Sequence, residues 1–490
     1  MIKDLLTKKP FVRVQPSNAI AQATAVGDIA NVPEEPNTQS YNIIRQSDFA
    51  CELYPSGHKI NSPLYYPNKI KYDETNKRYF EQPVIRTAFP FQRIIMTQQL
   101  IHICGNDIHI ESTNNHISEE DRVATLELKK GWLDKNMEIA FYELAKSVKS
   151  TGDGAIVIYM NNGSVRYKSL SYSNGDVLFP HYDFNGDLDC FARKYRDYDE
   201  DGDAVVEWVD VWDKKYFSTY KRSLKGVSST ISWIKEFFGV DGYELVSTNI
   251  HGFSEVPVVY QRDDNGPCWT DSQEAIDKYE LAVSHLCQNN MAYAFPIMVL
   301  KGEDVEIQGD IYGDVKCITM GSEDDAKYLS PQDASSSFTI QLNTLLKMIF
   351  MGSFIVEPPE VKSGDLPGVA IKLIYSPSLE KAIIDAKEYD KSVDKLVRLF
   401  KFGYGIEIGK VTQMANLSVF SWIEPYVHQN NSELVNSLCM LVNSKLLSIN
   451  TGSTLTGYGE NNEFDKIMRE YKEQNATDLL NDIIPPANNE

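Results

Sequence analysis

The sequence has no cysteine pair at metal-binding or redox spacing and no apolar run approaching the ~18 residues of a membrane span. Its seven cysteines stand singly, at positions 51, 104, 190, 268, 287, 317 and 439. An odd, scattered set favours a reducing compartment and argues against a disulfide framework and a zinc site. We expect each cysteine to be a small buried hydrophobic residue. The start, MIKDLLTKKPFVRVQP, lacks the apolar core of a signal peptide, so we expect no export.

Motifs for hydrolysis and nucleotide binding are also missing. The chain contains no G-x-S-x-G, no H-E-x-x-H and no Walker-type G-x-x-x-x-G-K-[ST]. A hydrolase needs a nucleophile and a base at a recognisable spacing, and a P-loop needs glycines that let the backbone approach phosphate. We therefore predict that the protein is not an enzyme and uses no cofactor.

Two patterns approach metal-ligand spacing without reaching it. Of the eight histidines, only His102, His109 and His116 recur at a regular interval, and we expect His102 and His109 to lie in strands as partly buried side chains. Residues 197–208 begin like a calcium-binding loop, but Trp208 replaces the bidentate glutamate at position twelve. We predict an acidic hairpin turn there and no metal site in the chain.

Positive charge is scarce: 48 Lys and Arg face 69 Asp and Glu, which gives a net charge of −21. A protein that grips nucleic acid normally presents a basic face, because phosphate neutralisation supplies most of the affinity. The acidic balance can simply serve solubility. The one basic cluster with interleaved aromatics, residues 214–226, superficially suits single-stranded nucleic acid, but a solvated outer hairpin is the simpler interpretation.

With 490 residues the chain can form more than one domain, and its 42% hydrophobic and 24% charged residues are typical of a soluble globular protein. Residues 151–222 alternate with a period of two between NNG, SNG, FNG and EDG turns, which predicts successive strands. A further strand pair is expected over 243–261. A broad apolar face over 126–149 predicts one helix before these strands.

A helix, a β-rich insert and a second helix follow one another from residue 271. Asp271 and Glu274 have the spacing of a capping box at the start of the first helix. The insert, PIMVLKGEDVEIQGDIYGDVKCITMGS, alternates short β-favouring runs with glycine turns. The second helix, ASSSFTIQLNTLLKMIFMGSF, leads into a loop rich in Gly and Pro. A long helix then starts with Ser376 as N-cap and Pro377 in its first turn.

This order resembles the stem, clip, stem and tunnel-loop succession of the bacteriophage portal proteins of long-tailed phages with Gram-positive hosts. Three further features are similar to that family: Trp269 followed by Tyr279, the segment from Pro296 to Gly302, and the SG…GVA-x-K segment from Ser363 to Lys372. The last departs from the tighter family form, because several residues separate SG from VA. The resemblance covers roughly residues 140–475.

The resemblance implies an α+β fold with a β-rich wing, a two-helix stem, a small α/β clip and a C-terminal helical crown. It divides the chain into 1–45 N-terminal arm, 46–270 wing, 271–296 stem helix 1, 297–331 clip, 332–354 stem helix 2, 355–375 tunnel loop, 376–410 wing helix, and 411–490 crown and tail. Between its breakers the arm has little periodicity, so we expect it to be disordered or draped over a neighbouring subunit.

The function implied is that of a portal subunit in a dodecameric ring at one capsid vertex, assembled in the host cytoplasm. The ring would pass double-stranded DNA without sequence specificity during packaging and ejection. Its expected partners are the terminase large subunit, the major capsid and scaffolding proteins, and head–tail adaptors; no membrane is involved. An acidic wall that repels phosphate would let a duplex slide.

The implied DNA-contacting residues lie in the tunnel loop, with two stem lysines as secondary candidates lining the bore. They are Val361, Lys362, Ser363, Gly364, Asp365, Leu366 and Gly368 in the loop, and Lys278 and Lys347 in the stem. An ordinary surface connection and solvated helix lysines are the plain alternatives.

Two other classes stay open. A different ring-forming head-completion or connector protein would share β-rich domains but lack the helix–clip–helix order. An acidic enzyme acting on carbohydrate would need a pair of carboxylates in a cleft, and the sequence offers no such pair to nominate.

Overall fold

The computed structural model describes residues 2–9, 11–13, 42–73, 77–113, 118–224, 242–293, 297–301, 306–308, 317–319, 325–329, 335–357, 368–427, 431–455 and 466–472. The chain divides into two compact units: unit 1 comprises Met1–Glu357 with Glu380–Tyr426, and unit 2 comprises Pro358–Leu379 with Val427–Glu490. Helices and strands are mixed throughout unit 1, so the expected α+β class is confirmed at that level. None of the helices in the described ranges combines the length and the apolarity that a bilayer span requires.

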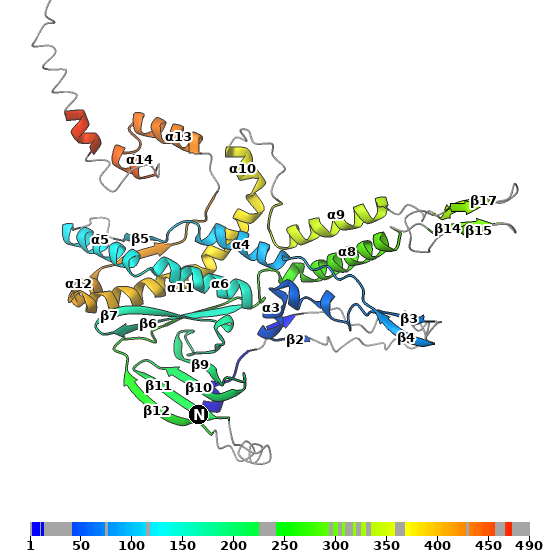
Figure 1. Cartoon of the computed structure of the whole chain (residues 1–490). Helices are drawn as coiled ribbons and strands as arrows, with labels where there is room; N and C mark the ends of the chain where they lie inside the picture. Colours follow the sequence, from blue (N-terminus) through cyan, green and yellow to red (C-terminus); the bar gives the residue numbers. More distant parts are fainter. Residues whose placement is uncertain are drawn as a thin grey trace, which may run out of the picture. The chain divides into compact units, whose positions relative to one another are not determined.

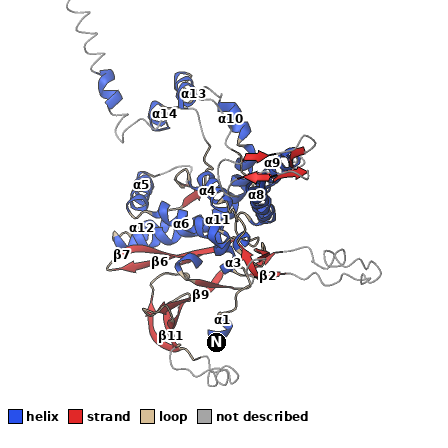
Figure 2. Cartoon of the chain, turned by 45° about the vertical axis from the view of Figure 1, so that its right-hand side comes forward, coloured by secondary structure: helices blue, strands red, loops and turns tan. Residues whose placement is uncertain are grey.

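The centre of unit 1 is a three-stranded antiparallel sheet in the order β13–β6–β7. Its strands are β6 (Asp153–Asn161), β7 (Ser164–Leu170) and β13 (Val258–Arg262). Ile156 and Ile158 pack with the helices α5 (Glu119–Asp134), α6 (Met137–Thr151) and α11 (Ser376–Glu407), which lie on one face of the sheet (Figures 1 and 2). Ala155 and Val157 pack in a separate cluster on the other face. The continuous apolar run AIVI in β6 follows from this two-sided burial.

The second cluster joins the central sheet to a five-stranded antiparallel sheet in the order β12–β11–β10–β9–β8. Its strands are β8 (Val177–Tyr182), β9 (Leu188–Tyr198), β10 (Ala204–Trp212), β11 (Tyr216–Ser223) and β12 (Glu244–Ile250). The strands and glycine turns predicted over 151–222 are confirmed, including the acidic turn in which Gly202 has a φ of +86°. The two strands predicted over 243–261 are present, but they do not pair with each other, because β12 and β13 belong to different sheets.

One helix was predicted over 126–149, and the structure has two. Asn136 adopts the left-handed conformation, φ 57° and ψ 39°, and separates α5 from α6. A continuous helix would keep all apolar residues on one stripe, whereas the break lets Trp132 of α5 and Phe141 of α6 each enter the core. Asparagine tolerates this backbone region better than most residues.

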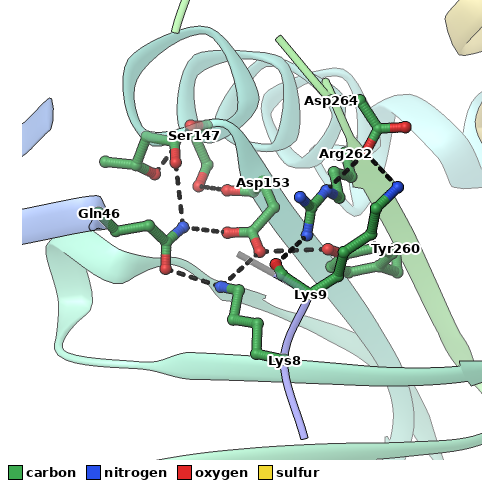
Figure 3. A network of polar contacts seen from close by, with 9 residues as sticks. Lys8, Lys9, Gln46, Ser147, Asp153, Tyr260, Arg262 and Asp264 are labelled. Atoms are coloured by element: carbon green, nitrogen blue, oxygen red, sulfur yellow. Dashed lines mark hydrogen bonds and ion pairs between the residues drawn. The ribbon is translucent and has the colours of Figure 1, made fainter. Parts of the chain in front are cut away.

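The start of the chain is bound to unit 1 by a buried polar network (Figure 3). Lys8 Nζ lies 2.8 Å from the fully buried carboxylate of Asp153 and 2.7 Å from Gln46 Oε1. The Tyr260 hydroxyl donates to the same carboxylate at 3.1 Å. Strand β1 (Phe11–Arg13) pairs with β2 (Asn42–Ile44), so both ends of the expected N-terminal arm attach to their own chain. Residues 14–41 lie outside the described part.

The remaining elements of unit 1 flank this core. They are α1 (Ile2–Leu5), α3 (Gln46–Glu52), β3 (Lys69–Asp73), β4 (Arg78–Gln82), α4 (Phe91–Cys104), β5 (His109–Ser112), α8 (Gln273–Tyr293), β14 (Ile297–Lys301), β15 (Glu306–Gln308), β16 (Cys317–Thr319), β17 (Asp325–Leu329), α9 (Ser335–Gly352), α12 (Val411–Asn416) and β18 (Val419–Trp422). His109 lies in a strand as predicted. His102 does not, since it lies in α4, where its Nδ1 is 2.9 Å from the Tyr426 carbonyl.

Unit 2 contains short helices in its described part. These include α10 (Gly368–Ile374), α13 (Asn431–Asn443) and α14 (Ile449–Leu455). Gly452 of α14 approaches Val442 so closely that a Cβ would come within 2.8 Å of its side chain, which packs α14 against the end of α13. The helix predicted from Ser376 begins there, but the Leu379 amide donates to the Tyr375 carbonyl, so Ser376 belongs to the first turn and is not the N-cap.

Cysteine burial differs from the uniform expectation. Cys51 and Cys439 are exposed, whereas burial raises the pKa of Cys104 and of Cys268 to about 12. Only the thiolate is nucleophilic, so at pH 8 we expect Cys51 and Cys439 to react with iodoacetamide at least about a hundredfold faster than Cys104 and Cys268. Peptide mass spectrometry after a labelling pulse measures this ratio, and equal rates in the folded protein would contradict the burial described.

Candidate functional site

The helix pair predicted around residues 271–354 is present as α8 and α9. The start of α8 packs against the end of α9, and we call this junction the root of the helix pair. Trp269, Ile276 of α8 and Ile349 of α9 are fully buried in one cluster. Ser272 Oγ donates to the Ile349 carbonyl at 2.9 Å. A Cβ at Gly352 would come within 2.8 Å of Ser272 Oγ, so glycine permits this close approach. The capping box expected at Asp271 is wrong, since residues 270–272 form a 3-10 turn ahead of α8.

A second face of α8 carries an extended segment, residues 83–90, which we call the strap. Three backbone amides of the strap donate to side chains of α8, from Ile85 to Gln288 at 3.1 Å, from Thr87 to Ser284 at 2.9 Å and from Phe89 to Glu280 at 2.8 Å. Alternate residues of the strap, at positions 85, 87 and 89, thus bond to residues spaced four apart along α8, at positions 288, 284 and 280. The match is geometric, because two extended residues advance about 6.7 Å and four helical residues about 6 Å.

Buried polar side chains extend this contact toward the root of α8. His58 and Glu280 are each 1% exposed, and His58 Nδ1 lies 2.6 Å from Glu280 Oε1. The other ring nitrogen lies 2.8 Å from the Glu52 carbonyl, which can only accept, so Nε2 carries a proton. Lys59 pairs with Asp277 at 2.7 Å. Polar side chains of α8 on the face toward residues 52–92 therefore pair with specific partners and set the register of the contact.

The outward face of α9 has a different character. Ile340, Met348 and Met351 are 67%, 55% and 77% exposed, although Leu345 and Ile349 on the opposite stripe are buried. A helix that is apolar on two faces has more apolar surface than one chain covers here. Between α8 and α9, strand β14 pairs antiparallel with β17 and β15 with β16, which confirms short strands in the insert.

The candidate DNA-contacting residues fall in different places. Val361, Lys362, Ser363, Gly364, Asp365 and Leu366 lie outside the described residues. Gly368 is the first residue of α10, so part of the expected loop is helical. Lys278 is exposed and pairs with Glu274 at 2.7 Å along α8. Lys347 is exposed on the outward face of α9.

No group of three or more His, Cys, Asp or Glu side chains able to hold a metal ion occurs among the described residues. In the acidic turn after β9, the Asp203 amide donates to Asp199 Oδ1 at 2.8 Å, so this carboxylate is used within the turn. The basic cluster over 214–226 is largely strand β11, and Arg222 is committed to Glu207 at 2.7 Å.

Comparison with known proteins decides the family. The sequence model described as "Phage portal protein, SPP1 Gp6-like" matches residues 57–477, most of the chain. The chain belongs to this family of phage portal proteins. A search of the curated proteins finds no significant match.

Among solved structures, this portal protein resembles a chain from the "Neck of empty GTA particle computed with C6 symmetry". The identity is 11%, the match covers 76% of this chain and 91% of the other, and the TM-score is 0.38.

The strap of the portal protein had no signature in its sequence. Residues 83–90, PVIRTAFP, show neither helical nor strand periodicity, and their partners lie about two hundred residues away along the chain. A polar stripe on α8 is the signal that could have revealed it. Gln273, Asp277, Glu280, Ser284 and Gln288 recur at helical spacing on a helix that is otherwise largely apolar.

Proposed function

We propose that this portal protein assembles as a dodecameric ring at one capsid vertex, where it forms the channel for DNA packaging and ejection. The family match over residues 57–477 carries the proposal. The exposed apolar face of α9 supports it, since a ring buries such a surface between copies. In the ring, the terminase motor and later the head–tail adaptors would dock at the end formed by the β14–β17 insert.

Within this ring we assign DNA contact to the tunnel segment. Lys362 would meet passing phosphate, while Val361 and Leu366 would close the channel around the duplex. Lys278 would line the bore as a weak cationic site, held in place by Glu274. The net charge of −21 per chain supports a wall that repels phosphate except at such points.

The test of this proposal is the mass and symmetry of the purified full chain, by native mass spectrometry together with negative-stain class averages. We expect a closed ring of the dodecamer mass with a central hole. A monomer that persists at high protein concentration would overturn the proposal.

A further inference from the structure

The hairpin formed by β3 and β4 has two chemically different faces. Cross-strand pairs place Ile70 opposite Glu81 and Tyr72 opposite Tyr79, so these four side chains share one face. The rings of Tyr72 and Tyr79 lie 5.0 Å apart. The other face carries Lys69, Lys71, Arg78, Phe80 and Gln82. We call the first of these the tyrosine face of the hairpin.

The tyrosine face is exposed where an apolar sheet face is normally covered. Ile70 is 72% exposed, Tyr72 51% and Tyr79 74%. Among the described strands, β3 and β4 pair only with each other. An isolated two-stranded hairpin is marginal in water and needs a further packing surface. Exposed tyrosines in a cluster are also the side chains that most often anchor protein interfaces.

The strap holds this hairpin in a fixed position, because residue 83 directly follows β4. Three amide hydrogen bonds fix the strap along α8, as described above. The guanidinium of Arg86 also donates to the Tyr66 carbonyl at 2.8 Å, which joins the segment after β4 to the segment before β3. The base of the hairpin is therefore attached to α8 through the strap.

A surface that complements the tyrosine face exists on α9. Its outward face offers three large apolar side chains, Ile340, Met348 and Met351, with Lys347 among them. The tyrosine face offers three large apolar side chains with Glu81 among them. Apolar area and one opposite charge therefore match on the two surfaces.

The two surfaces cannot meet within one chain. Helix α8 lies between α9 and the β3–β4 hairpin (Figure 1), with the strap on one of its faces and α9 on another. Two complementary patches on different sides of a molecule form a head-to-tail contact, which closes into a ring when the rotation allows.

We propose that the tyrosine face of one copy binds the outward face of α9 on the next copy, with Glu81 pairing with Lys347. This inference rests on the proposed ring. It assigns Lys347 to the contact between subunits and leaves Lys278 as the stem lysine for the bore. Nucleic acid is the less fitting occupant of the tyrosine face, because its charged residue is Glu81 and the cations Lys69, Lys71 and Arg78 lie on the opposite face.

Photo-crosslinking tests the contact in the full chain. The photoreactive residue p-benzoylphenylalanine replaces Tyr79 in one variant and Phe80, on the opposite face of the hairpin, in the matched control. We expect irradiation of the position-79 variant to give a ladder of covalent species beyond the dimer, with crosslinked peptides from residues 335–352. The position-80 variant should give a much weaker ladder.

Each other outcome has a defined meaning. A link within one chain, equal ladders from both positions, or links to other segments of an intact oligomer would overturn the inference and leave the ring standing. An adduct of position 79 with added duplex DNA in place of α9 would assign the face to nucleic acid and also overturn it. A protein that is monomeric by native mass spectrometry would overturn the proposed function itself.

A substitution pair gives a second readout. Tyr79→Asp should raise the concentration at which the oligomer dissociates by at least about tenfold, whereas Phe80→Asp should change it less. Circular dichroism checks that both variants remain folded. Equal dissociation of the two would contradict the face assignment.

Discussion

Asp385→Asn should lower the free energy of unfolding by about 3–5 kcal/mol, because it leaves a buried ammonium without its counter-ion. Asp385 accepts from Lys149 Nζ and from Lys381 Nζ, both at 2.6 Å. The Lys149 and Asp385 side chains are only 3% and 1% exposed. Lys381 is 26% exposed and can turn to water, whereas Lys149 cannot. Urea denaturation followed by circular dichroism measures the loss.

Two further variants separate the lost charge pair from a general packing defect. Lys149→Met combined with Asp385→Asn removes the stranded charge, so the double variant should recover most of the stability. Glu274→Gln breaks the exposed i,i+4 pair with Lys278 and should cost less than about 1 kcal/mol. A double variant that unfolds as readily as Asp385→Asn would refute the electrostatic account.

The Lys149–Asp385 ion pair shows why the buried face of α11 can be predicted only in part. Periodicity located the helix and its buried stripe, and Tyr389, Val393, Leu396 and Phe400 are buried as that stripe requires. Ile383 has the spacing of the same stripe but is 54% exposed. At that turn the buried side chain is Asp385, whose partner is Lys149 on α6. Periodicity treats a carboxylate as a surface residue, so a buried ion pair between distant helices remains invisible to it.

The sheets of unit 1 illustrate a second limit. Local turn chemistry located the β8–β9 and β9–β10 hairpins, since Gly186 and Gly202, both with positive φ, lie in their turns. Turn chemistry could not show that β13 pairs with β6, about a hundred residues earlier, and not with β12, the strand before it in the chain. Pairing across that distance depends on burial of the whole sheet between two layers.

The candidate site likewise has parts that the sequence predicts and parts that it does not. The two helices were predictable because their apolar residues recur over many turns. The strap was not, because an extended segment bound by side chains leaves no period. Around the β3–β4 hairpin the sequence shows only that aromatics are frequent, among them Tyr65, Phe80 and Phe89. Aromatics in a sequence predict burial on average, and here three large side chains of one face remain exposed.

Trp269→Ala should be the other strongly destabilising change, lowering the free energy of unfolding by about 3–5 kcal/mol. The indole is fully buried at the root of α8 and α9, and its Nε1 donates to Glu52 Oε2 at 3.0 Å. The substitution opens a cavity beside Ile276 and Ile349 and removes a hydrogen bond to α3. Circular dichroism in a urea series measures the change without relying on indole fluorescence.

Trp208→Ala is the matched control, because Trp208 is a half-buried indole on β10 that donates to Asp197 at the hairpin edge. It should cost markedly less. Trp269→Phe should fall between the two, since it keeps most of the apolar volume and loses the donor. Because Trp269 joins three elements that carry the helix pair, its loss should also weaken any assembly that depends on α9 at protein concentrations where the chain is still folded. Intact assembly in a folded Trp269→Ala variant would show that the helix pair keeps its geometry without this anchor.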